Sequence, residues 1–238
     1  MAVPPPPDGW LDYWTRVGDK RIFAEEARDH VARLRAVRPL RRTDAVLDFG
    51  CGFGHTVELL APLVGEVAFW DGAADVLRSA TARTAHLSNV KVVDLGDGDP
   101  LGRYDVVLVT SVVQYMRRDE LACWLARWRA MLRGGGRIVV SDVPRPDHSA
   151  WGEVGDMLRF ARRHGFLRQA VREGLAEAGR YARARRRIDL LRLTPPSLAA
   201  LAEGVGMSAE QLPANLTHRA GRYAVVLSNL RDEWGVNG

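Results

Sequence analysis

Three glycines alternate with other residues directly after a short apolar run. The run is Ala45–Phe49, and the loop that follows it reads Gly50-Cys51-Gly52-Phe53-Gly54. Glycines let a backbone turn tightly and approach a ligand without a side-chain clash. Asp48, just before the loop, would repel a phosphate but suits a ligand that carries an ammonium group. A dinucleotide fingerprint would need a glycine where this chain has His55, so the loop does not favour a pyrophosphate ligand.

A second acid closes the next apolar run. Asp71 follows Val67–Trp70 and precedes Gly72, 23 residues after Asp48. A carboxylate at the end of a parallel strand can accept hydrogen bonds from two neighbouring ribose hydroxyls. The alternative is that Asp71 caps the helix expected to begin at Ala73.

A third acid, Asp94, closes the run Val90–Val93 and precedes Leu95. A carboxylate and an apolar side chain at this point could bracket a purine, although Asp94 could equally be a turn residue. Because the carboxyl ends of parallel strands share one edge of a sheet, the acids after the three runs are expected to lie together. Jointly they predict a nucleoside site.

The rest of the chain alternates between strand-like and helix-like patterns. This alternation predicts an α/β fold with a doubly wound sheet and helices on both faces. The glycines 134–136 are expected to cap the helix before the fifth strand. The predicted strands are 45–49, 67–70, 90–93, 106–109, 137–143 and 223–227, and the predicted helices are 20–37, 56–64, 73–83, 121–132 and 197–204.

Residues 146–192 do not fit the alternation. They show no strand pattern but carry apolar residues at helical spacing. Since they follow the carboxyl end of the fifth predicted strand, they are placed either to cap a substrate or simply to pack as helices. We expect a single domain over 1–238, with an N-terminal leader and helix in 1–40 and this helical insertion at 146–192.

Composition excludes several classes of protein. Of the 238 residues, 47% are hydrophobic and 26% charged, values typical of a folded globular chain. The longest stretch without a charged residue is 106–116, too short to span a membrane, and the first residues show no secretion signal, so we expect a soluble, cytoplasmic protein. Two distant cysteines, Cys51 and Cys123, predict neither a disulfide framework nor a zinc site.

Basic residues outnumber acidic ones by 34 to 29, and all but two of the bases are arginines. They are spread along the chain rather than clustered, which disfavours a nucleic-acid partner. Arg183–Arg187 is the one dense patch. It could dock RNA or protein, hold an anionic substrate, or form the solvated face of a helix.

Four segments together resemble the class I S-adenosylmethionine-dependent methyltransferases. The stretch 46–54 resembles the first motif of that family, and 69–77 resembles the second motif with its ribose-binding acid. The stretch 104–113 is similar to the fourth-strand motif, and 131–138 is similar to the turn before the fifth strand. The likeness runs through about Asp44 to Val143 and implies a Rossmann-like, mostly parallel sheet of seven strands.

The resemblance also implies a cofactor and residue roles. S-adenosyl-L-methionine is the expected cofactor and S-adenosyl-L-homocysteine the expected product. Its methionine portion is expected along the loop of Gly50, Cys51, Gly52 and Gly54, with its amino end at Asp48. The ribose is expected at Asp71 and Gly72, the adenine at Asp94 and Leu95, and the donor methyl beside Ser111.

The acceptor is less clear from the sequence. Gln114 stands where histidine-based O-methyltransferases of this family carry their base, and a glutamine cannot carry a proton as histidine does. The candidate catalytic residues are therefore His148 and Tyr115. Candidate substrate contacts are Tyr13, Trp14, Gln114, Tyr115, His148 and Trp151. No acidic cluster indicates a catalytic metal.

These observations favour methyl transfer to a small molecule, such as a specialised metabolite. An RNA or protein methyltransferase that docks through Arg183–Arg187 is the alternative, and a non-catalytic scaffold that keeps the fold is a third hypothesis. The sequence leaves open whether oxygen, nitrogen or carbon is methylated. It also leaves the oligomeric state open.

Overall fold

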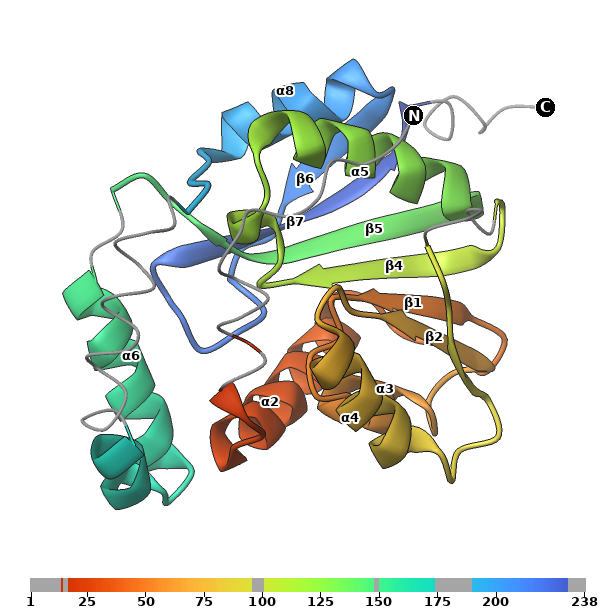
Figure 1. Cartoon of the computed structure of the whole chain (residues 1–238). Helices are drawn as coiled ribbons and strands as arrows, with labels where there is room; N and C mark the ends of the chain where they lie inside the picture. Colours follow the sequence, from red (N-terminus) through yellow and green to blue (C-terminus); the bar gives the residue numbers. More distant parts are fainter. Residues whose placement is uncertain (1–13, 15–16, 96–100, 148–149, 174–189, 231–238) are drawn as a thin grey trace.

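A seven-stranded sheet forms the centre of the protein (Figure 1). The computed structural model describes residues 14, 17–95, 101–147, 150–173 and 190–230. The strand order is β3-β2-β1-β4-β5-β7-β6, with β7 antiparallel to both of its neighbours and the other pairs parallel. The predicted doubly wound, mostly parallel sheet is confirmed. The strands are β1 (Ala45–Phe49), β2 (Glu66–Trp70), β3 (Val90–Val92), β4 (Tyr104–Thr110), β5 (Leu132–Pro144), β6 (Met207–Gln211) and β7 (Arg222–Asn229).

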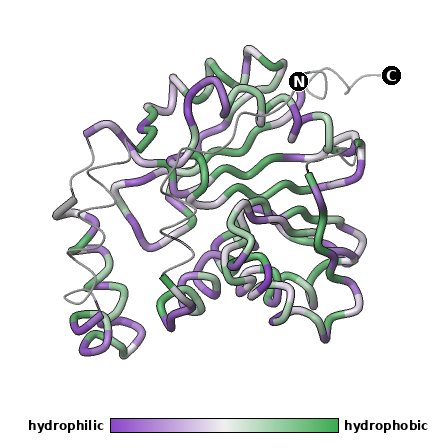
Figure 2. The backbone as a smooth tube through the Cα atoms, viewed as in Figure 1, coloured by the Kyte–Doolittle hydropathy of each residue, from purple (hydrophilic) through white to green (hydrophobic). Residues whose placement is uncertain are grey.

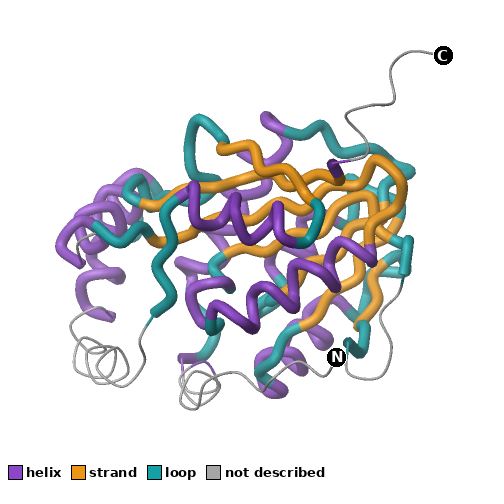
Figure 3. The backbone as a smooth tube through the Cα atoms, turned by 90° about the horizontal axis from the view of Figure 1, so that it is seen from above, coloured by secondary structure: helices purple, strands orange, loops and turns teal. Residues whose placement is uncertain are grey.

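Helices cover both faces of the sheet because its strands are apolar on both sides (Figure 2). One layer contains α5 (Arg118–Met131) and α8 (Pro195–Gly204), which Figure 3 shows crossing the strands. The other layer contains α2 (Arg21–Val37), α3 (His55–Leu60) and α4 (Ala74–Thr84). The alternation along β1 sends Leu47 and Phe49 to the first layer, and Val46 to the second.

Two features differ from the pattern-based prediction. The edge strand β6 was not predicted, because its segment, Met-Ser-Ala-Glu-Gln, has no apolar run. The glycines 134–136 do not cap α5, which ends at Met131; they lie inside β5. A side chain at Gly136 would come 2.9 Å from the backbone oxygen of Tyr104, so this glycine permits close approach at a register shift between β4 and β5.

The segment after β5 is helical where the structure describes it. The helix α6 (Ala150–Arg163) lies beyond the carboxyl ends of β4 and β5 (Figure 1), and residues 167–173 form a further helical stretch. Tyr13, His148 and the Arg183–Arg187 patch lie outside the described residues. None of the described helices is long and apolar enough to cross a membrane.

Candidate functional site

The glycine loop joins β1 to α3 in a backbone conformation that needs glycine. Gly50, Gly52 and Gly54 all have positive φ angles, of 77°, 56° and 80°. A side chain at Gly50 would come 2.3 Å from Cγ2 of Val112, so the turn after β4 lies directly against the loop. At Gly52, by contrast, a side chain would meet nothing within 4 Å. The loop therefore packs tightly at its first glycine and leaves open space at its second.

Asp48 ends β1 as a buried acid without a described counter-ion. Its side chain is on the strand face that packs against α2 and α3, the residue is 3% exposed, and Oδ2 has no hydrogen-bond partner in the described structure. Burial, with a smaller contribution from the Asp71 charge, raises the pKa of Asp48 to about 7. An unpaired carboxylate of this kind is costly to bury. A cationic group bound here would relieve that cost.

Asp71 joins the second strand to the glycine loop. Its Oδ2 accepts the N–H of Gly52 at 3.0 Å, and its Oδ1 accepts the N–H of Ala73 at 2.9 Å. Burial raises the pKa of Asp71, and the two N–H donors oppose that rise. A carboxylate has about four acceptor positions, so two remain for other donors. Asp71 does not cap α4, because the N-cap of that helix is Ala73 and no side chain caps it; the ribose-binding role of Asp71 stays a prediction.

The neighbouring candidates differ in exposure. Gly72 and Asp94 are exposed, while Leu95 is 2% exposed and packs in the apolar core with α5. Its backbone oxygen accepts from Arg127. Cys51 is buried, and burial raises the pKa of its thiol well above the usual value. Contacts of these four residues with a cofactor stay predictions.

Aromatic side chains gather beside the loop. Phe53 of the loop stacks on Phe23 of α2, with ring centroids 5.5 Å apart. Trp14 contacts Phe23 at 5.9 Å and meets Tyr115 edge-on at 6.4 Å. Tyr115 lies in the short 3-10 helix η1 (Val113–Tyr115), which follows β4. Trp14 and Tyr115, two of the predicted substrate contacts, are thus brought together.

Polar contacts tie the same N-terminal segment to the loop. Asp19 accepts from His55 at the start of α3 at 2.8 Å and pairs with Arg83 of α4. Arg83 also donates to the backbone oxygen of Phe53 at 2.9 Å. Asp19, just before α2, is therefore anchored to α3 and α4 beside the glycine loop.

At the ends of β4 and β5, two non-glycine residues adopt left-handed backbone conformations. Ser111 has a φ of 61° and Asp142 a φ of 63°. The Ser111 hydroxyl donates to Oδ2 of Asp142 at 2.7 Å. Such conformations cost free energy and persist only where surrounding contacts enforce them. They single out this pair as part of a site.

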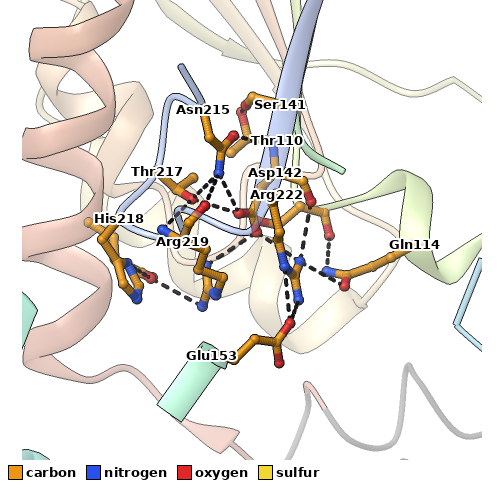
Figure 4. A network of polar contacts seen from close by, with 12 residues as sticks. Thr110, Gln114, Ser141, Asp142, Glu153, Asn215, Thr217, His218, Arg219 and Arg222 are labelled. Carbon is orange, nitrogen blue, oxygen red and sulfur yellow. Dashed lines mark hydrogen bonds and ion pairs between the residues drawn. The ribbon is translucent and has the colours of Figure 1, made fainter. Parts of the chain in front are cut away.

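Asp142 is buried like Asp48 but is fully partnered (Figure 4). Its Oδ1 accepts from Asn215 and Thr217, and its Oδ2 also accepts from Arg219 at 3.2 Å and Arg222 at 3.0 Å. Burial acts to raise the pKa of Asp142, but the two guanidinium groups outweigh it and hold that pKa well below its usual range. The carboxylate is therefore ionised and can only accept hydrogen bonds.

Arg222 of β7 links this carboxylate to two other elements (Figure 4). It donates to Oε1 of Gln114 at 3.0 Å and from Nε to Glu153 of α6 at 3.1 Å. Gln114 donates in turn to the backbone oxygen of Ser111 at 2.8 Å. Gln114 is 4% exposed and has both ends of its amide engaged, so in this structure it holds the β4 turn in place. Its predicted substrate contact is untested.

A second ionic contact extends the network towards α2. Arg219 pairs with Glu26 at 3.2 Å, and Glu26 also contacts Nδ1 of His218 at 2.9 Å. His218 stacks on Phe160 of α6, with ring centroids 4.5 Å apart. Burial acts to raise the pKa of Glu26, but Arg219 and His218 outweigh it and lower that pKa. The network thus connects α2, α6 and the sheet edge.

Sequence reasoning missed this network. Its charged residues, Asp142, Arg219, Arg222 and Glu153, were not singled out as site residues. One available signal was an acid at the carboxyl end of a buried strand. The other predicted residues of this region cannot be placed: Tyr13 and His148 lie outside the described residues, and for Trp151 only its place in α6 is described. No group of three metal-binding side chains occurs among the described residues.

The arrangement fits S-adenosylmethionine. Its ammonium group matches the unpartnered Oδ2 of Asp48, and its ribose hydroxyls match the remaining acceptor positions of Asp71. Open space at Gly52 leaves room for a ligand to lie against the loop. Asp48 and Asp71 come from neighbouring strands, paired from Ala45↔Glu66 to Phe49↔Trp70, so both acids reach the same edge.

Part of the chain is similar to known methyltransferases. Residues 47–138 match a family model described as a methyltransferase domain. The chain is 31% identical over 147 residues to "N-terminal Xaa-Pro-Lys N-methyltransferase 1" of Ailuropoda melanoleuca, covering 59% of this chain and 65% of the relative. It is 31% identical over 138 residues to "Trans-aconitate 2-methyltransferase" of Agrobacterium fabrum, covering 56% of this chain and 53% of the relative. The match thus spans less than two thirds of these relatives.

A solved structure shows the same fold over nearly its whole length. The DhpI complex with SAH superposes with a TM-score of 0.60 and 15% sequence identity, covering 93% of this chain and 96% of DhpI. The glycine loop, the strand order and the two acids at the sheet edge are compatible with S-adenosylmethionine as the cofactor. Residues 47–138 are therefore similar to the methyltransferase-domain family, and the fold of the chain is that of DhpI.

Proposed function

We propose that the protein transfers a methyl group from S-adenosylmethionine to a small-molecule acceptor. The cofactor supplies an activated methyl on a sulfonium, and its loss leaves S-adenosylhomocysteine. Because that group is already activated, the protein mainly has to hold donor and acceptor in line. The donor and the acceptor are proposed to bind between the glycine loop and the Ser111–Asp142 pair.

The observation that carries this proposal is the attachment of α6 to the sheet edge. Glu153 of α6 binds Arg222, and Asp156 of α6 accepts the N–H of Ala220 at 2.9 Å. This helix lies beyond the ends of β4 and β5 (Figure 1), where it could limit the size of an acceptor. We therefore infer that the insertion 146–192, which contains α6, acts as a cap that admits a small acceptor.

A protein acceptor is the second candidate. It is favoured by the relatives whose name describes methylation of N-terminal Xaa-Pro-Lys sequences. The other curated relative is named for a small acid, trans-aconitate. The matches to both kinds cover little more than half of this chain, so they support the donor chemistry more than the acceptor.

The donor site is tested by titration calorimetry with S-adenosylhomocysteine. We expect binding by the wild type and at least about tenfold weaker binding by Asp71→Ala, because a charged hydrogen-bond partner is lost. The matched control is Asp75→Ala, which removes an exposed acid of α4 that pairs with Arg78. Folded wild-type protein that does not bind S-adenosylhomocysteine would refute the proposed function.

The acceptor class is tested with methyl-labelled S-adenosylmethionine and a mixed panel. The panel contains small amines, phenols and carboxylates including trans-aconitate, a peptide beginning Xaa-Pro-Lys, and a structured RNA at low salt. We expect label in small molecules. Label only in the peptide would move the assignment to the second candidate, and label only in RNA would favour the arginine patch.

A further inference from the structure

The family resemblance implies that Ser111 lies beside the donor methyl, and the hydrogen of its hydroxyl is already engaged. It donates to Oδ2 of Asp142, which is ionised and can only accept. No described residue donates to the Ser111 oxygen. The oxygen can therefore accept a hydrogen bond from a bound molecule but cannot offer one.

The backbone holds Ser111 in this role. Its left-handed conformation is fixed by the N–H bond to Ser141 and by Gln114, which binds its carbonyl oxygen. Val112, the next residue, packs against Gly50. The hydroxyl is thus set between the glycine loop and the carboxylate of Asp142, where its oxygen favours a hydrogen-bond donor.

The guanidinium groups nearby are not free to bind an anion. Arg222 is engaged by Asp142, Glu153 and Gln114, and Arg219 by Asp142 and Glu26. Among the described residues, a carboxylate acceptor placed beside Ser111 would therefore meet a lone pair rather than a hydrogen-bond donor.

From these contacts we propose that the acceptor is an amine nitrogen, which donates an N–H to Ser111 while its lone pair faces the methyl group. This inference rests on the proposed methyl-transfer function and names the acceptor chemistry within it. Ser111 is then a specificity-determining contact, and Asp142 is a positioning residue that acts through it.

A hydroxyl acceptor fits less well. Its oxygen would have to lose a proton, and the route through Ser111 ends at Asp142, whose pKa two arginines hold too low to take a proton. A neutral amine needs no such step. Its lone pair forms the N–C bond, the S–C bond breaks with its electron pair going to sulfur, and the methylammonium product afterwards gives its proton to water.

The test uses sinefungin, an analogue in which a carbon-bound amine replaces the methyl-bearing sulfonium. We expect the wild type to bind sinefungin about tenfold or more tightly than S-adenosylhomocysteine, because the amine can donate to Ser111. This ratio of the two dissociation constants should fall severalfold in Ser111→Ala. It should fall equally in Ser111→Gly, which loses the hydroxyl but tolerates the left-handed backbone.

Because the ratio compares two ligands on one protein, a general loss of affinity or stability cancels. Ser79→Ala, which removes an exposed hydroxyl of α4, is the matched control and should leave the ratio unchanged. A wild-type ratio near one, or a ratio unaltered in both Ser111 variants, overturns the inference. So does labelled methyl recovered as an ester of any carboxylate in the acceptor panel. Failure to bind S-adenosylhomocysteine at all would instead refute the proposed function.

Discussion

Two aspartates at the same edge of the sheet are equally buried and have opposite electrostatics. Asp48, at the end of β1, has one unpartnered oxygen, and its pKa is raised to about 7 by burial and by Asp71. Asp142, near the end of β5, accepts hydrogen bonds from Ser111, two arginines and two neutral side chains, and its pKa is lowered. The first has the chemistry of a site for a cationic group, whereas the second is a completed structural centre. Burial alone therefore does not distinguish a ligand-binding acid from a structural one, but the hydrogen-bond and ionic partners of each acid do.

The largest expected effect comes from breaking the completed centre. Arg222→Met removes the cation shared by Asp142 and Glu153 and leaves both acids partly uncompensated. We expect the free energy of unfolding to fall by about 3–5 kcal/mol, measured by urea denaturation. Arg133→Met, which breaks the partly exposed pair with Asp105, should cost no more than about 1 kcal/mol. Equal losses in the two variants would contradict the contrast.

An intermediate effect of opposite sign on the free energy of unfolding is expected at Asp48, whose Oδ2 has no described partner. Asp48→Asn should stabilise the cofactor-free protein by on the order of 2 kcal/mol at pH 8. Because the folded pKa is raised, ionisation penalises the native state increasingly as pH rises from the unfolded value, about 4, to about 7. The stabilisation should therefore vanish near pH 4. A difference between variant and wild type that is independent of pH would contradict this interpretation.

The smallest effect concerns ligand binding. If the ammonium group of the cofactor binds ionised Asp48, the affinity for S-adenosylhomocysteine should rise about tenfold between pH 6 and pH 8. The rise should be absent for 5′-methylthioadenosine, which lacks the amino-acid portion, and for Asp48→Asn. Calorimetry in buffers of different ionisation enthalpy measures the released proton directly. The same pH dependence for both ligands would exclude Asp48 as its source.

The same contrast explains what the sequence could predict. Asp48, the glycine loop and Asp71 follow apolar runs within a short stretch of chain, and local spacing was enough to place them on one edge. The Asp142 centre joins residues 80 positions apart, such as Asp142 and Arg222, through an antiparallel strand and a loop. No local pattern announces such a contact. The strand β6 was missed for a related reason, since its residues are partly exposed at the sheet edge.

The acceptor side was also only partly predictable. Gln114 and Tyr115 were singled out by their place after the fourth strand, and the structure places both in η1, directly after β4. Their partners decide what they can do: the amide of Gln114 is engaged by Arg222 and Ser111, whereas Tyr115 meets Trp14. Hydrogen-bond commitments of this kind depend on tertiary structure and cannot be inferred from residue type.

The attachment of α6 has a consequence for how such enzymes diversify. The described part of this helix meets the sheet edge through two acids, Glu153 and Asp156, while the glycine loop and its acids belong to other elements. A replacement segment that kept two suitably spaced carboxylates could dock on Arg222 and on the backbone of Ala220. If α6 caps the acceptor as proposed, exchanging this one segment would change the acceptor preference without rebuilding the glycine loop and its acids.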